Sequence, residues 1–125
     1  MTKILLVGLG GVIGAVSRYL LGDWVARISG DHWFPFGTLV INVTGCLAIG
    51  FLAGLADSRG LFSSEARVFM LIGIIGSFTT FSTFGYESIE LMRGGLFFAA
   101  VLNIVLQVVI GLGAVWAGGV LARSL

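Results

Sequence analysis

Long apolar runs alternate with short polar connections along this chain. The runs cover about residues 4–21, 38–56, 68–92 and 96–122. Each is long enough to cross the bilayer hydrocarbon as a helix, which takes about 20 apolar residues. None shows the alternation of apolar and polar positions that is typical of β-barrel strands. The pattern predicts an all-α membrane protein with four transmembrane helices in a single domain, residues 1–125.

The first run permits a second interpretation. Lys3, the apolar stretch after it and the small residues at 15–17 resemble a cleavable signal peptide. The run continues past that point and its centre is rich in glycine. We therefore favour a retained first helix.

The third run carries an unusual polar stretch at its middle. Residues 76–84 read GSFTTFSTF, so hydroxyls and aromatic rings crowd a segment expected in hydrocarbon. An unbroken helix, with its hydroxyls bonded to the preceding turn, is one interpretation. Hydroxyl and β-branched residues after a glycine make a poor helix centre, however. We expect a break near residues 76–80, as in the discontinuous helices of transporters, where free main-chain groups line a path or hold an ion.

Polar residues also occur inside the other apolar runs. Arg18 shares a helical face with Gly10 and Gly14, which predicts a close helix contact and an arginine directed into protein or a water-filled vestibule. An arginine that snorkels to the interface is the alternative. Asn42 lies early in the second run, and Asn103 and Gln107 are one turn apart in the fourth. These amides predict either hydrogen bonds between helices or the wall of a polar track.

Composition narrows the function classes. The chain is 58% hydrophobic and 10% charged, with a mean hydropathy of +1.09 and a formal net charge of +1. Basic residues are scattered singly, so we expect no nucleic-acid partner. His32 and Cys46 are each the single residue of their type, which disfavours a histidine or cysteine metal site and excludes an intrachain disulfide. The sequence contains no catalytic constellation, so no enzyme is predicted.

The basic residues give only a weak orientation signal. One side of the predicted bundle receives Lys3, Arg59, Arg67 and Arg123, and the other receives Arg27, Arg93 and, depending on its depth, Arg18. Such a small bias permits insertion in both directions. It would thus permit an antiparallel homodimer in contact with membrane lipid. A pathway would need a dimer, because four helices alone leave no obvious pore.

The polar groups inside the membrane are mainly neutral hydrogen-bond donors. The positive ring edges of Phe81 and Phe84 are suited to a small anion. Its water shell would be replaced by the side-chain donors Asn42, Ser82, Thr83 and Asn103. Free carbonyls at the break suit a dehydrated alkali cation. If two breaks meet on a dimer axis, these carbonyls form a cage for a fixed cation.

Three segments together resemble a known family. They are GGVIGAVSRY at residues 10–19, GTLVINVTG at 37–45, and the segment at 73–84 that ends in TTFSTF. The chain is similar to the Fluc (CrcB-type) fluoride channels over its whole length. The chain departs from the usual pattern at Ser77, Gly85 and the start of the fourth helix, where Phe97 and Phe98 stand in place of a common tyrosine.

The resemblance implies a dual-topology antiparallel homodimer in the inner cell membrane, with two pores that export fluoride passively and relieve its toxicity. It implies a structural sodium ion at the dimer centre, held by the main-chain carbonyls of Gly76 and Thr79. Phe81 and Phe84 would form an aromatic box in each pore. The resemblance also implies that Asn42 donates a hydrogen bond to fluoride. Ser82, Thr83 and Asn103 would line the polar track, and Arg18 would lie in the vestibule.

Two other classes compete with this interpretation. Small multidrug or guanidinium exporters are also short dual-topology dimers, but they need a glutamate in the first helix. Residues 4–21 contain no acid. A non-transporting assembly factor would explain the glycines but not the clustered threonine, serine and phenylalanine.

Overall fold

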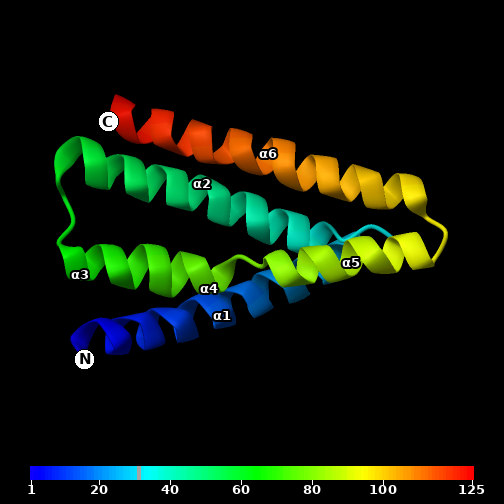
Figure 1. Ribbon diagram of the computed structural model, residues 1–125, viewed down its shortest axis with the longest axis horizontal. Coiled ribbons are helices and arrows are strands. Elements are labelled where there is room, and N and C mark those ends of the chain that lie inside the picture. The colour runs from blue at the N-terminus through cyan, green and yellow to red at the C-terminus, as the bar shows by residue number, and fades with distance from the viewer. Residues whose placement is uncertain (31) are drawn as a thin grey trace.

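The computed structural model describes residues 1–30 and 32–125, and helices account for most of this part of the chain (Figure 1). Their order is α1 (Thr2–Ser29), α2 (Phe36–Arg59), α3 (Ser64–Arg67), the π-helix η1 (Val68–Ile75), α4 (Gly76–Phe78), α5 (Phe81–Arg93) and α6 (Phe97–Ser124). In the described part, four helical spans are long and apolar enough to cross a membrane. The third is the composite Ser64–Arg93, made of α3, η1, α4 and α5. The prediction of four helices with an interrupted third is confirmed.

The first helix is longer than the sequence pattern predicted. It continues through Gly22 to Ser29 and ends at Gly30, whose φ of 67° is one that glycine adopts without strain. An ion pair of 2.9 Å between Arg27 and Asp23, one turn apart, lies in the added segment. A single glycine with helix-forming neighbours does not end a helix, so part of the expected first loop is helical.

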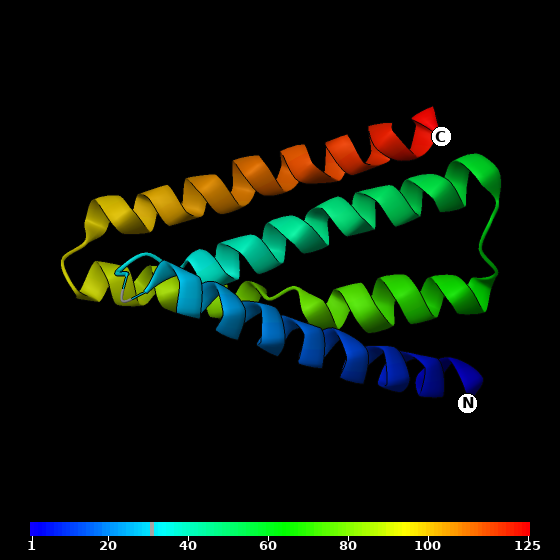
Figure 2. The same cartoon turned by 180° about the vertical axis from the view of Figure 1, so that it is seen from behind.

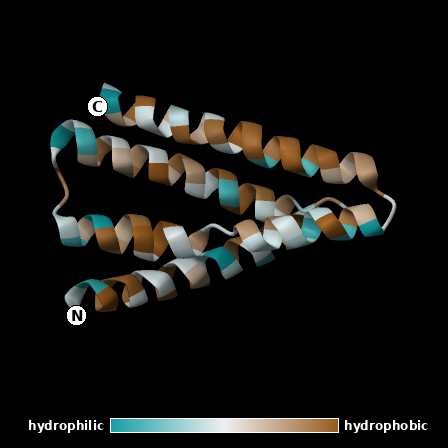
Figure 3. Ribbon diagram, in the orientation of Figure 1, coloured by the Kyte–Doolittle hydropathy of each residue, from teal (hydrophilic) through white to brown (hydrophobic). Residues whose placement is uncertain are grey.

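The spans form an open bundle whose two termini lie at the same end (Figures 1 and 2). Helix α6 runs beside α2, while α1 packs against η1 and α4 and then crosses toward α2. Hydrophobic residues occur along all four spans, with near-neutral and a few hydrophilic residues between them (Figure 3). Many large apolar side chains are exposed on this chain, as expected for a protein that contacts lipid or a second copy.

Glycines bring α1 into main-chain contact with the third span. A Cβ on Gly10 would lie 2.7 Å from the carbonyl oxygen of Phe69 and 2.9 Å from the Cα of Gly73. A Cβ on Gly14 would collide with the Ile74 carbonyl. The face shared by Gly10 and Gly14 therefore holds η1 against α1, which confirms the predicted close contact.

This contact gives a stability prediction. Gly10→Ala is expected to lower the stability of the purified protein by about 1–3 kcal/mol, because the added methyl has no room against the η1 backbone. Gly8→Ala is the matched control on the same helix, since nothing lies within 4 Å of its Cβ position. Thermal unfolding in detergent measures both variants. Equal melting temperatures for the two variants would show that the helices are not packed this closely.

Candidate functional site

The third span loses its helical conformation at two consecutive threonines. Helix α4 ends at Phe78, Thr79 has φ −78° and ψ 159°, and Thr80 has φ −148° and ψ 109°. Both are extended conformations, which β-branched residues adopt readily. Helix α5 then begins at Phe81. The break is narrower than predicted, because Gly76–Phe78 is still helical.

The Asn42 side chain bonds both main-chain groups of Thr80. The Thr80 N–H donates to Asn42 Oδ1 at 2.8 Å, and Asn42 Nδ2 donates to the Thr80 carbonyl at 3.1 Å. Asn42 Nδ2 also donates to Gln107 Oε1 at 3.0 Å. The amide thus replaces the helical hydrogen bonds that Thr80 gives up. Its predicted role as a fluoride donor stays a prediction, and both hydrogens of Nδ2 have protein acceptors here.

The Thr80 hydroxyl caps α5 and orients the hydroxyl of Thr83. Thr80 Oγ1 accepts from the Thr83 N–H at 3.2 Å and donates to Thr83 Oγ1 at 2.8 Å. It also lies 3.4 Å from Ser82 Oγ. Because Thr83 Oγ1 accepts the Thr80 hydrogen, its own hydrogen is available to an acceptor outside this group. Both Ser82 and Thr83 are exposed on this chain.

Removal of this cap is expected to lower the stability of the protein. Thr80→Val should lower stability by about 1 kcal/mol, the usual cost of a lost N-cap side chain. Thr80→Ser keeps the hydroxyl and should retain most of that stability. Thermal unfolding of the two variants decides the point, and equal losses would show that the hydroxyl does not cap α5.

Carbonyl groups remain free where α4 ends. A helix leaves its last four carbonyls without helical partners. Ile75 O accepts from the N–H of Thr79 at 3.1 Å and from its hydroxyl at 3.2 Å. Thr80 N–H, the helical partner of the Gly76 carbonyl, is bonded to Asn42 instead. Gly76 lies exposed on this chain, so the two predicted cation-binding positions, Gly76 and Thr79, offer main-chain oxygens of the kind that alkali cations bind.

An aromatic pair stands beside the break. The rings of Phe81 and Phe84 have centroids 5.4 Å apart and meet edge to face at 61°. Phe81 is 82% exposed on this chain. Both rings, together with Asn42, Gly76, Thr79 and Gln107, line a pocket of about 350 Å³. The structure therefore brings most of the predicted site residues together in one place.

Asn103 and Arg18 lie apart from that pocket lining. Asn103 is fully buried and donates to Ser88 Oγ at 3.0 Å, and Ser88 donates to the Phe84 carbonyl at 2.8 Å. Asn103 thus supports the backbone behind Phe84. Arg18 is half-buried and makes no hydrogen bond or ion pair with any described residue. The pore role of Asn103 and the vestibule role of Arg18 stay predictions.

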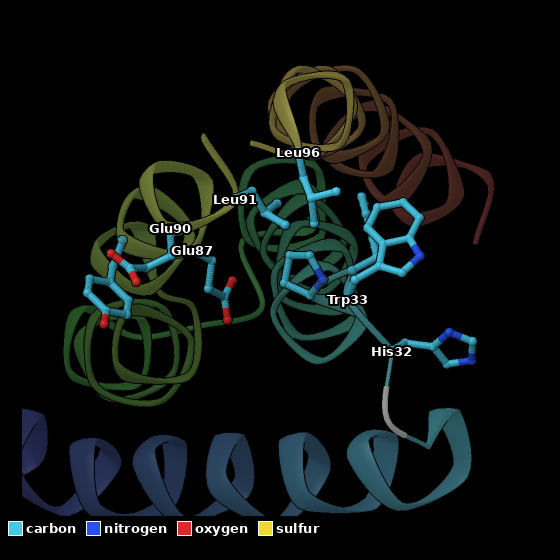
Figure 4. A pocket seen from close by; sticks show the side chains of 9 residues that line it. His32, Trp33, Glu87, Glu90, Leu91 and Leu96 are labelled. Carbon is cyan, nitrogen blue, oxygen red and sulfur yellow. The ribbon is translucent and has the colours of Figure 1, made fainter. Parts of the chain in front are cut away.

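A polar contact between α2 and α5 was not predicted from the sequence. Helix α2 begins at Phe36 with Pro35 as its cap, so Thr38 lies inside the helix. Its hydroxyl donates to Glu87 Oε1 at 2.7 Å. Glu87 lines a second pocket, of about 380 Å³, in which the His32 ring points away from the carboxylate (Figure 4). The position of Glu87 inside an apolar span indicates that its carboxylate needs a polar partner.

Three buried polar atoms have no hydrogen-bond partner among the described residues. They are Glu87 Oε2, Asn103 Oδ1 and Gln107 Nε2. The sequence indicated Gln107 only as part of a polar track, because Gln107 lies one helical turn from Asn103. The structure places it on Asn42 and on the pocket at the break.

These features define a multi-pass membrane protein with a discontinuous helix beside a pocket lined by uncharged polar residues and aromatic rings. The chain belongs to the CrcB family. The family described as "CrcB-like protein, Camphor Resistance (CrcB)" matches residues 5–119.

Curated relatives cover nearly the whole chain. A protein of Methylobacillus flagellatus is 46% identical over 94% of this chain and 92% of its own length. Relatives from Methanosarcina acetivorans and Geobacter sulfurreducens are 43% and 44% identical over 100% of this chain, and over 94% and 100% of their own lengths. All three are named fluoride-specific ion channel FluC. The family resemblance inferred from the sequence is confirmed, as is the expectation of a channel in place of an enzyme.

Proposed function

We propose that this protein is a fluoride channel that exports fluoride passively across the inner cell membrane. The observation that carries the proposal is the break at Thr79 and Thr80, which opens beside a pocket lined by amide and aromatic groups. The names of the relatives support fluoride as the ion.

The chemistry of the pocket favours a small anion. A bare halide requires hydrogen-bond donors to replace its water, and ring edges carry partial positive charge. The pocket presents the Phe81 and Phe84 rings, and the Thr83 hydroxyl beside the break has a hydrogen to donate. No carboxylate occurs among the described residues that line it. A cation would find no charged partner on this path.

The exposed break is the argument for a second copy. A free carbonyl and an exposed aromatic pair at mid-span are unfavourable against lipid, where each unsatisfied main-chain group costs several kcal/mol. A homodimer in which two breaks meet would cover them. The weak charge bias of the sequence favours an antiparallel arrangement of the two copies.

A structural sodium ion fits the donor set at the centre of such a dimer. Gly76 and Thr79 from each copy would hold it through main-chain carbonyl oxygens, which are hard ligands suited to alkali cations. The ion would satisfy carbonyls that the helix end leaves free. It would also supply a fixed positive charge near the anion path.

The rival function, export of drugs or guanidinium, requires a glutamate in the first helix, which this chain does not have. The extended α1 does contain one acid, Asp23, near its end. That carboxylate is paired with Arg27 at 2.9 Å and is partly exposed. It is therefore not an unpaired acid at the centre of the membrane.

A growth experiment tests the proposal in cells. The chain is expressed in a bacterium that lacks its own fluoride exporter. We expect a higher fluoride concentration at half-maximal growth and no change in tolerance to guanidinium or quaternary ammonium compounds. Unchanged fluoride sensitivity, with raised tolerance to those cations, would favour the rival function.

A further inference from the structure

We infer that Asn42 and Gln107 form a relay that holds the main chain at the break from the neighbouring helices α2 and α6, with Gln107 as the positioning residue. The inference rests on the function proposed above. Three hydrogen bonds carry it. Two join Thr80 to Asn42, at 2.8 and 3.1 Å, and one joins Asn42 to Gln107, at 3.0 Å.

The main chain of Thr80 fixes the orientation of both amides. A backbone N–H only donates and a carbonyl only accepts, so Asn42 Oδ1 must face the N–H and Nδ2 must face the carbonyl. The second hydrogen of Asn42 Nδ2 then points to Gln107, which must offer Oε1. Gln107 Nε2 is left as the free end of the relay, buried and without an acceptor among the described residues.

Gln107 fixes Asn42 in this orientation from α6. If Gln107 turned around, it would present an N–H group to Asn42 Nδ2, and two donors cannot bond to each other. Gln107 Nε2 is buried, so Gln107 acts on the break through Asn42. In a continuous helix, Thr80 would satisfy its own main-chain groups and would not orient Asn42.

The relay also reaches the proposed cation site. Thr80 follows directly on Thr79, whose carbonyl belongs to the proposed sodium site. A group that holds the peptide between these two residues also fixes the position of that carbonyl. Because linkage is reciprocal, loss of the Gln107 contact should weaken sodium binding, although Gln107 supplies no ligand to it.

The test uses two substitutions at Gln107 with different expected signatures. Gln107→Leu removes the acceptor for Asn42. It should raise the sodium concentration that half-saturates fluoride efflux from liposomes by about tenfold, the effect of one lost buried hydrogen bond. Gln107→Glu keeps an acceptor for Asn42, so it should leave the sodium half-saturation close to normal. Val109→Ala is the control on the same helix, because Val109 is exposed and does not line the pocket, and it should change neither the sodium half-saturation nor the maximal efflux.

A second readout does not depend on transport. Hydrogen exchange at the Thr80 amide should be about tenfold faster in Gln107→Leu and unchanged in Val109→Ala, because the relay holds the bond that protects this amide.

The outcomes separate this inference from the proposed function. If the unmodified protein carries no fluoride, the proposed function fails. If it conducts but efflux is independent of sodium, both the cation site and the relay are contradicted. If Gln107→Leu keeps the normal sodium half-saturation, or leaves Thr80 exchange unchanged, the relay alone is overturned.

Discussion

Phe81→Ile and Phe84→Ile are each expected to lower fluoride efflux from liposomes about tenfold, and the double substitution about 100-fold. An aromatic edge contact contributes about 0.5–1.5 kcal/mol, and each 1.4 kcal/mol of barrier changes a rate tenfold. Isoleucine retains apolar bulk but has no positive edge to offer an anion. The two rings lie 5.4 Å apart beside the break, so the loss of either removes half of the pair.

A matched control separates ring chemistry from packing. Phe98 is 78% exposed on α6, close to the 82% of Phe81, and it does not line the pocket at the break. Phe98→Ile should conduct normally. Normal conduction by the Phe81 and Phe84 variants as well would remove the aromatic pair from the mechanism.

The second large effect is expected at Gly76. A Cβ there meets only the Leu71 carbonyl oxygen, at an ordinary contact distance of 3.6 Å, so the protomer itself accommodates a side chain. Alanine should even favour the helix by about 1 kcal/mol over glycine. In the proposed dimer, however, the Gly76 carbonyl faces the cation and the second copy. Gly76→Val should therefore abolish fluoride efflux and weaken the dimer.

Thr79→Val provides the comparison. This isosteric change removes only the 3.2 Å hydrogen bond from the Thr79 hydroxyl to Ile75 O and leaves the main-chain carbonyl in place. Efflux should fall by less than about tenfold, in line with one lost hydrogen bond. Efflux and oligomeric state are measured for both variants. A Gly76→Val protein that is dimeric and active would contradict a cation site at the break.

The sequence predicted the spans and the break because both follow from local chemistry. Apolar length specifies a transmembrane helix, and the run of threonine, serine and phenylalanine after Gly76 disfavours a regular one. The pairing of Phe81 with Phe84 also follows from their spacing of three residues. The contact of Gly10 and Gly14 with another helix followed from their shared face.

Other features depend on tertiary contacts that no local pattern specifies. The amide of Asn42 was predicted as a donor, but its bonds to Thr80 and Gln107 arise only when α2, α5 and α6 pack together. The spacing of Asn103 predicted a residue of the polar track, yet the packing of α6 on α5 buries it against Ser88. The eight-residue π-helix η1 was not predicted, because no feature of the hydrophobic pattern indicates it.

The most direct test of the account is the efflux of fluoride and chloride from liposomes that contain the purified protein. If the broken third span forms an anion path of neutral donors, fluoride should leave rapidly and without an applied proton gradient, while chloride is retained. Efflux of both halides at equal rates, or of neither, would contradict the account.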